Sequence, residues 1–167
     1  FSAAESQAKE SQTISIEKIS SKVYGVKPFK VKALASSKLP VAILVSGPAE
    51  IDQFGVLSVK GVGMVRLIAI QNGNKQFIAA KPVLLSFEVV KAELTVVAED
   101  KTVSKGETVP ELTIEYRGFV NGDSMKSLKN PAIAKVVETG KGLLKKTRIV
   151  PSGAESPNYT FKYLTGV

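Results

Sequence analysis

The sequence contains no histidine, no cysteine and no tryptophan in its 167 residues. Histidine is the most common general base and metal ligand, and cysteine is the most common thiol nucleophile, so most familiar routes to catalysis are excluded. Carboxylates remain, but neighbours such as Glu99 and Asp100 would face opposite ways on a strand and could not act on one bond together. We therefore predict a binding or structural module rather than an enzyme, with no cofactor and no bound metal.

Long apolar runs are also missing, and none approaches the ~20 residues of a membrane-spanning helix. The lack of cysteine favours an exported protein, because exported chains either pair their cysteines or avoid them. Hydrophobic residues make up 44% of the chain and charged residues 23%, a composition that can bury a core. The length suits two domains of about 80 residues each.

The net charge of +8 comes from 23 basic and 15 acidic residues. Residues 1–90 carry +5 (11 basic minus 6 acidic) and residues 91–167 carry +3 (12 minus 9), so neither half is a basic arm. Dispersed lysine indicates solubility and a weak attraction to surface glycans or other anionic polymers. No arginine cluster is interleaved with aromatic residues, so we expect no nucleic-acid partner.

Residues 1–11 are small, polar and without periodicity, which predicts a flexible lead-in. From residue 12 onward the pattern becomes that of short strands. Phe29, Val31, Ala33 and Ala35 alternate with other residues, as in a half-buried strand, and four more apolar segments follow, separated by Gly, Pro and Asn turns. Those segments span 40–47, 54–61, 62–71 and 82–90.

The strand pattern restarts at residue 91. Strands are expected at 92–100, around 112–116 and at 158–163, where aromatic residues alternate, and one strand or a strand pair is expected around 143–150. Asn121-Gly122-Asp123 predicts a tight turn, and one helical turn is expected near 124–128, capped by Asp123 or Ser124. We predict an all-β protein of two tandem Ig-like β-sandwich domains, 12–90 and 91–167, with little or no helix and a junction near 89–92.

Candidate ligand-contacting residues are aromatic or basic. The stripe of Tyr159, Phe161 and Tyr163 could stack on sugar rings, although alternating aromatics more often face a core. Lys145, Lys146 and Arg148 form the densest basic patch, which suits an anionic glycan or protects an edge strand from aggregation. The candidate contacts are Tyr159, Tyr163, Phe119, Lys145, Lys146 and Arg148.

Both halves resemble known repeats. Segments such as VYGVKPF at 23–29 and IAIQNGNKQFIAAKPV at 68–83 resemble the Ig-like repeats of large bacterial surface proteins. LTVVAEDKTVSKGETVPELTIEYRGFVNGDS at 94–124, followed by PSGAESPNYTFKY at 151–163, resembles the MBG-type repeats that often follow such units in bacterial adhesins. The second resemblance departs at Ser104-Lys105-Gly106, where MBG-like units usually have Tyr-Gly, and it implies one more strand after Gly166.

The resemblance implies a non-catalytic structural or adhesive module of a large secreted bacterial cell-surface protein, located outside the cell, where it would act as a stalk or spacer repeat. Its partners would be neighbouring repeats of the parent protein, without membrane insertion. The alternative is a carbohydrate-binding module of a secreted glycan-degrading system. Exposed, coplanar aromatic rings would favour that alternative, and buried rings would favour the spacer.

Overall fold

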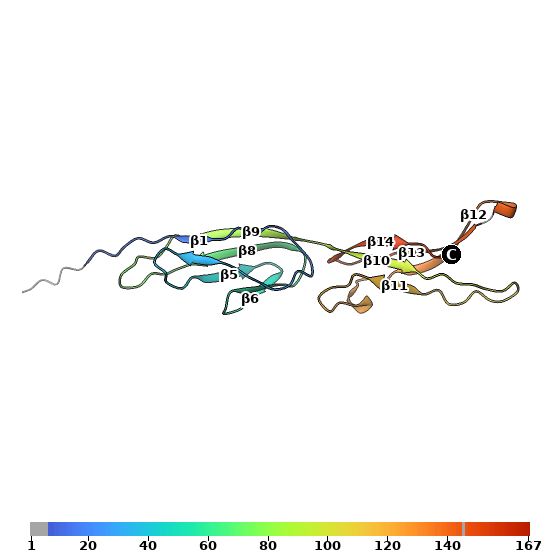
Figure 1. Ribbon diagram of the computed structural model, residues 1–167, viewed down its shortest axis with the longest axis horizontal. Coiled ribbons are helices and arrows are strands. Elements are labelled where there is room, and N and C mark those ends of the chain that lie inside the picture. The colour runs from blue at the N-terminus through green and yellow to red at the C-terminus, as the bar shows by residue number, and fades with distance from the viewer. Residues whose placement is uncertain (1–6, 145) are drawn as a thin grey trace, which may run out of the picture. The chain divides into compact units, whose positions relative to one another are not determined.

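The computed structural model describes residues 7–144 and 146–167, and it is almost entirely β-structure (Figure 1). This confirms the predicted all-β sandwich class. The chain divides into two compact units: unit 1 ends at Val90 and unit 2 begins at Lys91. Within the described ranges the only helical elements are two 3-10 turns, and no helix is long and apolar enough to cross a membrane.

Unit 1 contains nine strands in three antiparallel or mixed sheets. A four-stranded sheet has the order β2-β9-β8-β5, a three-stranded sheet has the order β3-β7-β6, and β1 pairs with β4. The bounds are β1 Ile14–Ile16, β2 Lys22–Val23, β3 Phe29–Lys30, β4 Ala33–Ala35, β5 Ala42–Ser46, β6 Ala49–Ile51, β7 Val56–Val59, β8 Gly63–Ile70 and β9 Val83–Val90.

The core of unit 1 lies between these sheets. Alternate residues of β8 point inward, so Val65, Leu67 and Ala69 are fully buried while their neighbours are not. The rings of Phe29 from β3 and Phe87 from β9 meet edge to face, with centroids 6.0 Å apart. The aromatic contact joins the four-stranded and three-stranded sheets and is worth about 1 kcal/mol beyond the buried area.

Two expectations for unit 1 need correction. The alternating segment 29–35 is not one strand, because β3 pairs with β7 while β4 pairs with β1, in a different sheet. The predicted flexible lead-in covers residues 1–11. Residues 1–6 lie outside the described part of the chain, but the end of the lead-in is bound to the rest of unit 1. The Glu10 N–H donates to the Gln76 carbonyl at 2.8 Å, and the Glu10 carbonyl accepts the Ile78 N–H at 2.9 Å. These two hydrogen bonds form a parallel bridge between Glu10 and Phe77.

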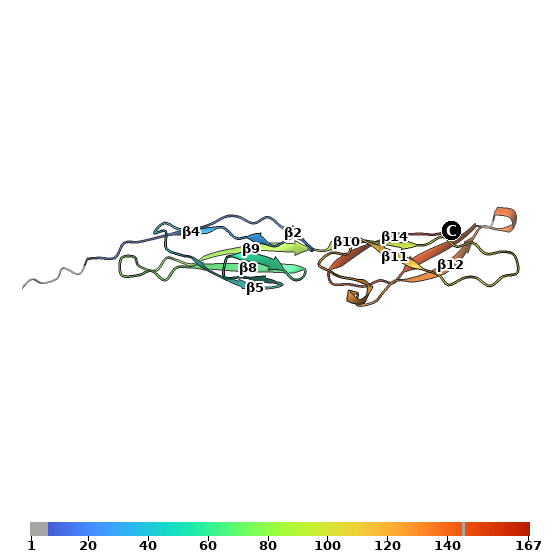
Figure 2. The same cartoon turned by 60° about the horizontal axis from the view of Figure 1, so that its bottom comes forward.

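Unit 2 contains five strands in two sheets, one with the order β11-β10-β14 and one formed by β12 and β13 (Figure 2). The sheets meet where Gly166 pairs with Ile149 of β13. The bounds are β10 Ala92–Ala98, β11 Ile114–Arg117, η1 Met125–Ser127, β12 Ile133–Thr139, η2 Gly142–Leu144, β13 Lys146–Ser152 and β14 Tyr159–Leu164. The chain passes from β9 to β10 through Lys91 alone.

The core of unit 2 is small. Its main buried residues come from three strands that contact one another: Leu94 and Val96 of β10, Ile149 and Pro151 of β13, and Tyr159 of β14. The predicted turn is present: Asn121 and Gly122 have φ of 56° and 71°, and the Asp123 N–H donates to the Val120 carbonyl at 3.0 Å. Two positive φ values in sequence favour Asn-Gly, as in a type I′ turn.

Local signals also place the first 3-10 turn. The Ser124 side chain accepts a hydrogen bond from the Lys126 N–H at 3.3 Å, and the Ser127 hydroxyl accepts one from the Ser124 N–H at 3.1 Å. This reciprocal cap begins η1 at the expected position. The strand or strand pair expected around 143–150 is the second strand of a hairpin: β13 pairs with β12, which begins at Ile133, and Leu143 lies in η2 between the two strands.

Candidate functional site

Tyr159 is a structural residue of unit 2. Its ring is 2% exposed, and its hydroxyl accepts a hydrogen bond from the Val120 N–H at 3.1 Å. The hydroxyl also lies 2.7 Å from Asp123 Oδ2, to which it donates. Tyr159 therefore fastens the 120–123 turn to β14, and its buried ring presents no stacking surface to a ligand.

Phe119 lies in the same aromatic cluster. Its ring centroid is 5.5 Å from that of Tyr116 and 5.6 Å from that of Tyr159, the latter nearly perpendicular at 88°. The Tyr116 hydroxyl accepts the Ala132 N–H at 2.8 Å. The cluster thus joins β11, β14 and two loops. Sequence reasoning missed Tyr116 because its partner is remote in the chain.

Tyr163 is more accessible, with 38% of its surface exposed, yet its hydroxyl accepts the Ala154 N–H at 3.1 Å. Its ring lies nearly parallel to that of Phe161, with centroids 6.2 Å apart. Both residues are on the side of β14 that Leu94 and Val96 share on β10, because the parallel register pairs them directly. Tyr159, Phe161 and Tyr163 therefore lie on the core side of β14, and their solvent exposure increases toward the end of the strand.

A shallow groove runs beside the beginning of β14. It is lined by Lys91, Lys129, Glu155, Thr160 and Phe161, among others. Glu155 accepts from the Asn130 side chain at 3.0 Å and lies 3.2 Å from Lys129 Nζ. Lys129, Asn130 and Glu155 are largely exposed to solvent, so their contacts are screened surface interactions.

The basic candidates lie on the β12–β13 hairpin. Lys146 and Arg148 are exposed and belong to the same face of β13, two residues apart. Lys145 lies outside the described residues. The register adds a residue that the sequence pattern did not reveal: Lys135 pairs with Val150, which puts Lys135 on the face that carries Arg148 and Lys146.

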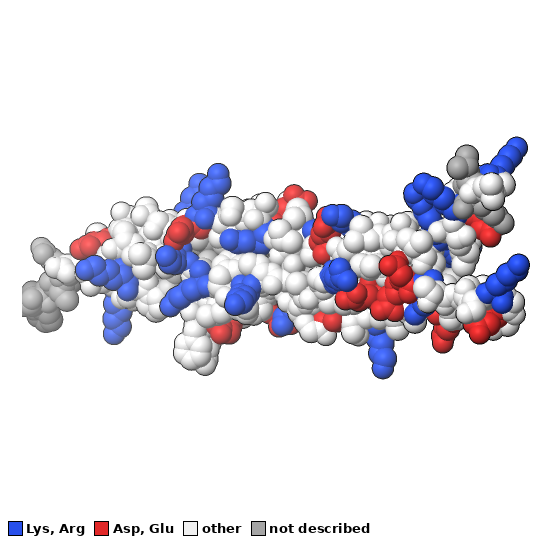
Figure 3. All heavy atoms as spheres, turned by 45° about the vertical axis from the view of Figure 1, so that its right-hand side comes forward, with Lys and Arg blue, Asp and Glu red and all other residues white. Residues whose placement is uncertain are grey.

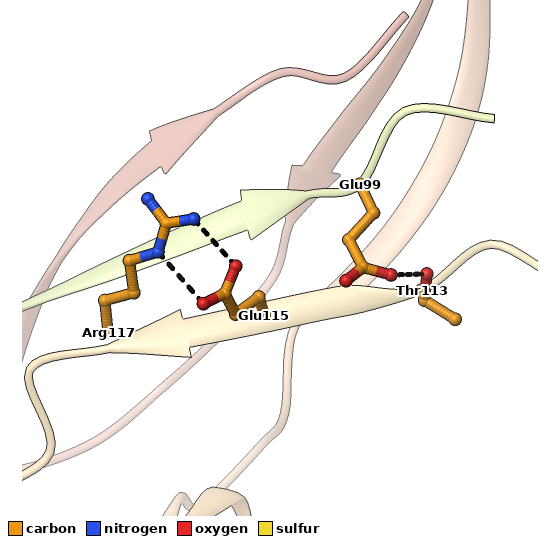
Figure 4. Close-up of polar contacts among 4 residues, drawn as sticks. All are labelled: Glu99, Thr113, Glu115 and Arg117. Carbon is orange, nitrogen blue, oxygen red and sulfur yellow. Dashed lines mark hydrogen bonds and ion pairs between the residues drawn. The ribbon is translucent and has the colours of Figure 1, made fainter.

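Polar residues on β11, and next to the ends of β10 and β11, form exposed surface pairs (Figure 4). Arg117 donates to both carboxylate oxygens of Glu115, at 3.0 and 2.8 Å, and Thr113 donates to Glu99. The hydrogen bonds from Arg117 lower the pKa of the Glu115 carboxyl, and the positive charge of Arg117 adds to the effect. In the described part of the chain, no group of three or more Asp or Glu side chains gathers as a metal site would require.

The first and last strands of unit 2 form its most extended parallel pair. β10 and β14 are parallel neighbours over six residue pairs, from Ala92 opposite Tyr159 to Val97 opposite Leu164. The Ala92 N–H donates to the Asn158 carbonyl at 3.0 Å, and the Thr160 hydroxyl donates to the Ala92 carbonyl at 3.3 Å. Unit 1 has a shorter parallel pair, between its second and last strands, in which Lys22 and Val23 of β2 pair with Val89 and Val90 of β9.

The comparison with known families concerns unit 2. Residues 94–167 match the family model of the MBG domain, YGX type. The match covers less than half of the chain but nearly all of unit 2, and it supports the predicted MBG-type repeat there. An MBG domain suggests a repeat module of a surface protein. No curated protein matches the chain.

The segment Ser104-Lys105-Gly106, where the sequence departs from the Tyr-Gly usual in MBG-type repeats, contains a glycine. Gly106 has φ of 87°, and the Glu107 N–H donates to the Ser104 carbonyl at 3.0 Å, so the segment 104–107 forms a closed turn. A residue with a side chain would be strained at this φ. The Ig-like repeat expected over 12–90 remains a prediction for unit 1.

Proposed function

We propose that this chain is a non-catalytic, load-bearing spacer of a large secreted bacterial surface protein, in which each unit serves as a stalk repeat. The MBG-type match over 94–167 supports a repeat module of a surface protein. The observation that carries the load-bearing role is the parallel pairing of β10 with β14, the first and last strands that the structure describes in unit 2.

Parallel terminal strands resist tension for a geometric reason. When the start of β10 and the end of β14 are pulled in opposite directions, the force runs along both strands. The hydrogen bonds between the six residue pairs then share the load and must break nearly together. A force that separates the strands from one end breaks those bonds one after another, at a much lower force.

The short connection between the units supports the same role. Only Lys91 separates β9, which ends at Val90, from β10, which begins at Ala92. A spacer with no flexible linker transmits tension from one unit to the next without slack. Neighbouring repeats of the parent protein would be its partners, and its site of action would be the cell surface.

The alternative, a carbohydrate-binding module, receives less support. Tyr159 is buried, Phe119 packs within an aromatic cluster, and the Tyr163 hydroxyl is bound to a backbone N–H. These rings hold loops in place. Phe54 is 69% exposed, but it lies in unit 1 at the turn before β7, where Asp52 Oδ1 accepts its N–H.

Single-molecule pulling across unit 2 of the full chain tests the proposal. The sequence has no cysteine, so attachment points can be introduced freely. Lys91→Cys with Val167→Cys loads β10 and β14 along their length. Lys91→Cys with Pro157→Cys, a matched control, separates the same strands from one end.

We expect the lengthwise geometry to unfold at a force several-fold higher than the separating geometry, since the backbone bonds share the load only in the first. Equal forces in the two geometries would contradict a load-bearing role for the strand pair. An unchanged far-UV circular dichroism spectrum establishes that both double variants are folded before they are pulled.

A further inference from the structure

The β12–β13 hairpin carries three cations in a row on one face. In the antiparallel register Lys135 is opposite Val150, and Arg148 is opposite Val137, one step diagonally from Lys135. Lys146 lies two residues before Arg148 on the same strand and on the same face. Diagonal and same-strand neighbours on one face lie about 7 Å apart, so the three positions form a line of regularly spaced positive charge.

This face belongs to a part of unit 2 that is open to solvent. Lys135, Lys146 and Arg148 are all exposed, and the hairpin ends in η2, away from the rest of unit 2 in both ribbon views (Figures 1 and 2). Basic side chains gather on this hairpin in the space-filling view (Figure 3).

The positive charge is not compensated within the hairpin face. The acidic residue of β12, Glu138, pairs with Thr147 and therefore belongs to the opposite face. Among the residues that the structure describes, no carboxylate lies within ion-pair distance of Lys135, Lys146 or Arg148. Other lysines of the chain do have such partners, for example Lys129 with Glu155 and Lys32 with Glu17.

The side chains between the cations are aliphatic. Ile133 and Val137 belong to the same face and are 52% and 40% exposed. No aromatic residue occurs between positions 133 and 152, so the face lacks the stacking surfaces that single-stranded nucleic acid needs. A strand face with spaced cations and small apolar patches fits a linear polymer with spaced anions and apolar ring faces.

From this arrangement we infer that the outer face of the β12–β13 hairpin binds an anionic polysaccharide. The guanidinium of Arg148 and the ammonium groups of Lys135 and Lys146 would pair with carboxylate or sulfate groups along the polymer. Ile133 and Val137 would contact the sugar rings between those groups. The inference is independent of the spacer role, because a load-bearing repeat can act whether or not it binds such a polymer.

The test compares two triple variants of the full chain. K135Q/K146Q/R148Q removes the charges of the hairpin face, while K105Q/K126Q/K162Q removes three exposed charges elsewhere in unit 2. Both variants lower the net charge of +8 by three, so they differ only in the position of the lost charge. Binding to heparin and to polygalacturonate is measured by calorimetry, with dextran as the uncharged polymer.

We expect the wild-type chain to bind both anionic polymers at low salt, and binding to weaken at about 150 mM NaCl, where the Debye length is about 8 Å. The hairpin variant should lose roughly tenfold or more in affinity and should show a smaller salt dependence. The control variant should stay within about twofold of wild type, and dextran should not bind.

Three outcomes would overturn the inference. Equal losses in the two variants would mean that overall charge, rather than the hairpin face, attracts the polymer. Failure of the wild-type chain to bind either polymer at low salt would show that the hairpin face is not a polysaccharide-binding site. Hairpin-dependent binding to vesicles of phosphatidylserine and phosphatidylcholine, without polysaccharide binding, would assign the face to lipid instead. Superimposable far-UV circular dichroism spectra exclude unfolding as the cause of any loss.

Discussion

The hydroxyl of Tyr159 provides the sharpest prediction about what holds unit 2 together. Tyr159→Phe keeps the buried ring and its contact with Phe119 but removes one oxygen atom. That oxygen accepts the Val120 N–H and donates to the Asp123 carboxylate. Because the ring is 2% exposed, water cannot easily take the place of the hydroxyl.

The expected cost follows from the groups left without a partner. The Val120 N–H, half-buried against the buried ring, loses its acceptor, and a backbone N–H left without a partner costs about 1–3 kcal/mol; the half-buried Asp123 carboxylate can turn to water. We therefore expect Tyr159→Phe to lower the free energy of unfolding of unit 2 by about 2 kcal/mol. For a unit of this size the melting temperature should fall by about 8–16 °C.

Tyr163→Phe is the matched control. It removes a hydroxyl that also accepts a backbone N–H, from Ala154, but Tyr163 is 38% exposed and water can reach the site. We expect less than about 1 kcal/mol for this change. Urea and thermal unfolding, followed by far-UV circular dichroism, measure both variants. A Tyr159→Phe variant as stable as wild type, or no less stable than Tyr163→Phe, would refute the assigned role.

Two further predictions concern the turn between β5 and β6 and the surface of β11. A Cβ atom at Gly47, where φ is 97°, would lie 2.3 Å from the Met64 carbonyl oxygen, so Gly47→Ala should destabilise unit 1 by about 3 kcal/mol or more. At Gly122 nothing lies within 4 Å of such an atom, and Gly122→Ala should cost only about 1 kcal/mol, with urea unfolding as the measurement; equal costs would contradict the steric argument. Arg117→Gln should return the pKa of Glu115 toward its ordinary value in an NMR titration, whereas Arg148→Gln should leave it unchanged. Folding lowers the pKa of Glu115, so the Glu115–Arg117 pair stabilises the folded protein at pH values above the ordinary carboxyl pKa. This stabilisation is lost as the pH falls through the lowered pKa. A Glu115 pKa that Arg117→Gln leaves unchanged would contradict this prediction.

Local sequence signals predicted several elements well. The long strands β8, β9 and β10 show apolar runs or alternation, with turn formers on both sides of β8 and before β9, and their expected bounds lie close to the observed ones. Asn121-Gly122 and Ser124 specify a turn and a cap through their own backbone preferences and side-chain oxygens. Such features depend on neighbours within a few residues, which a sequence displays directly.

Features that depend on distant partners were not predictable in the same way. The alternation over 29–35 is real, but period two does not show that the chain changes sheets between β3 and β4. β12 was missed because most of its residues are exposed on both faces, so its sequence lacks a one-sided apolar pattern. The link between Tyr159 and Val120 spans 39 residues, and Lys135 joins Arg148 only through the hairpin register.

Pulling the whole chain by its two ends tests the central claim, the load-bearing role, most directly. The account predicts two separate unfolding events, each releasing about 25 nm of chain. The weaker event belongs to unit 1, whose parallel pair between β2 and β9 has two residue pairs, and the stronger event matches the force measured between residues 91 and 167. Gradual extension at low force, without two such events, would contradict the account.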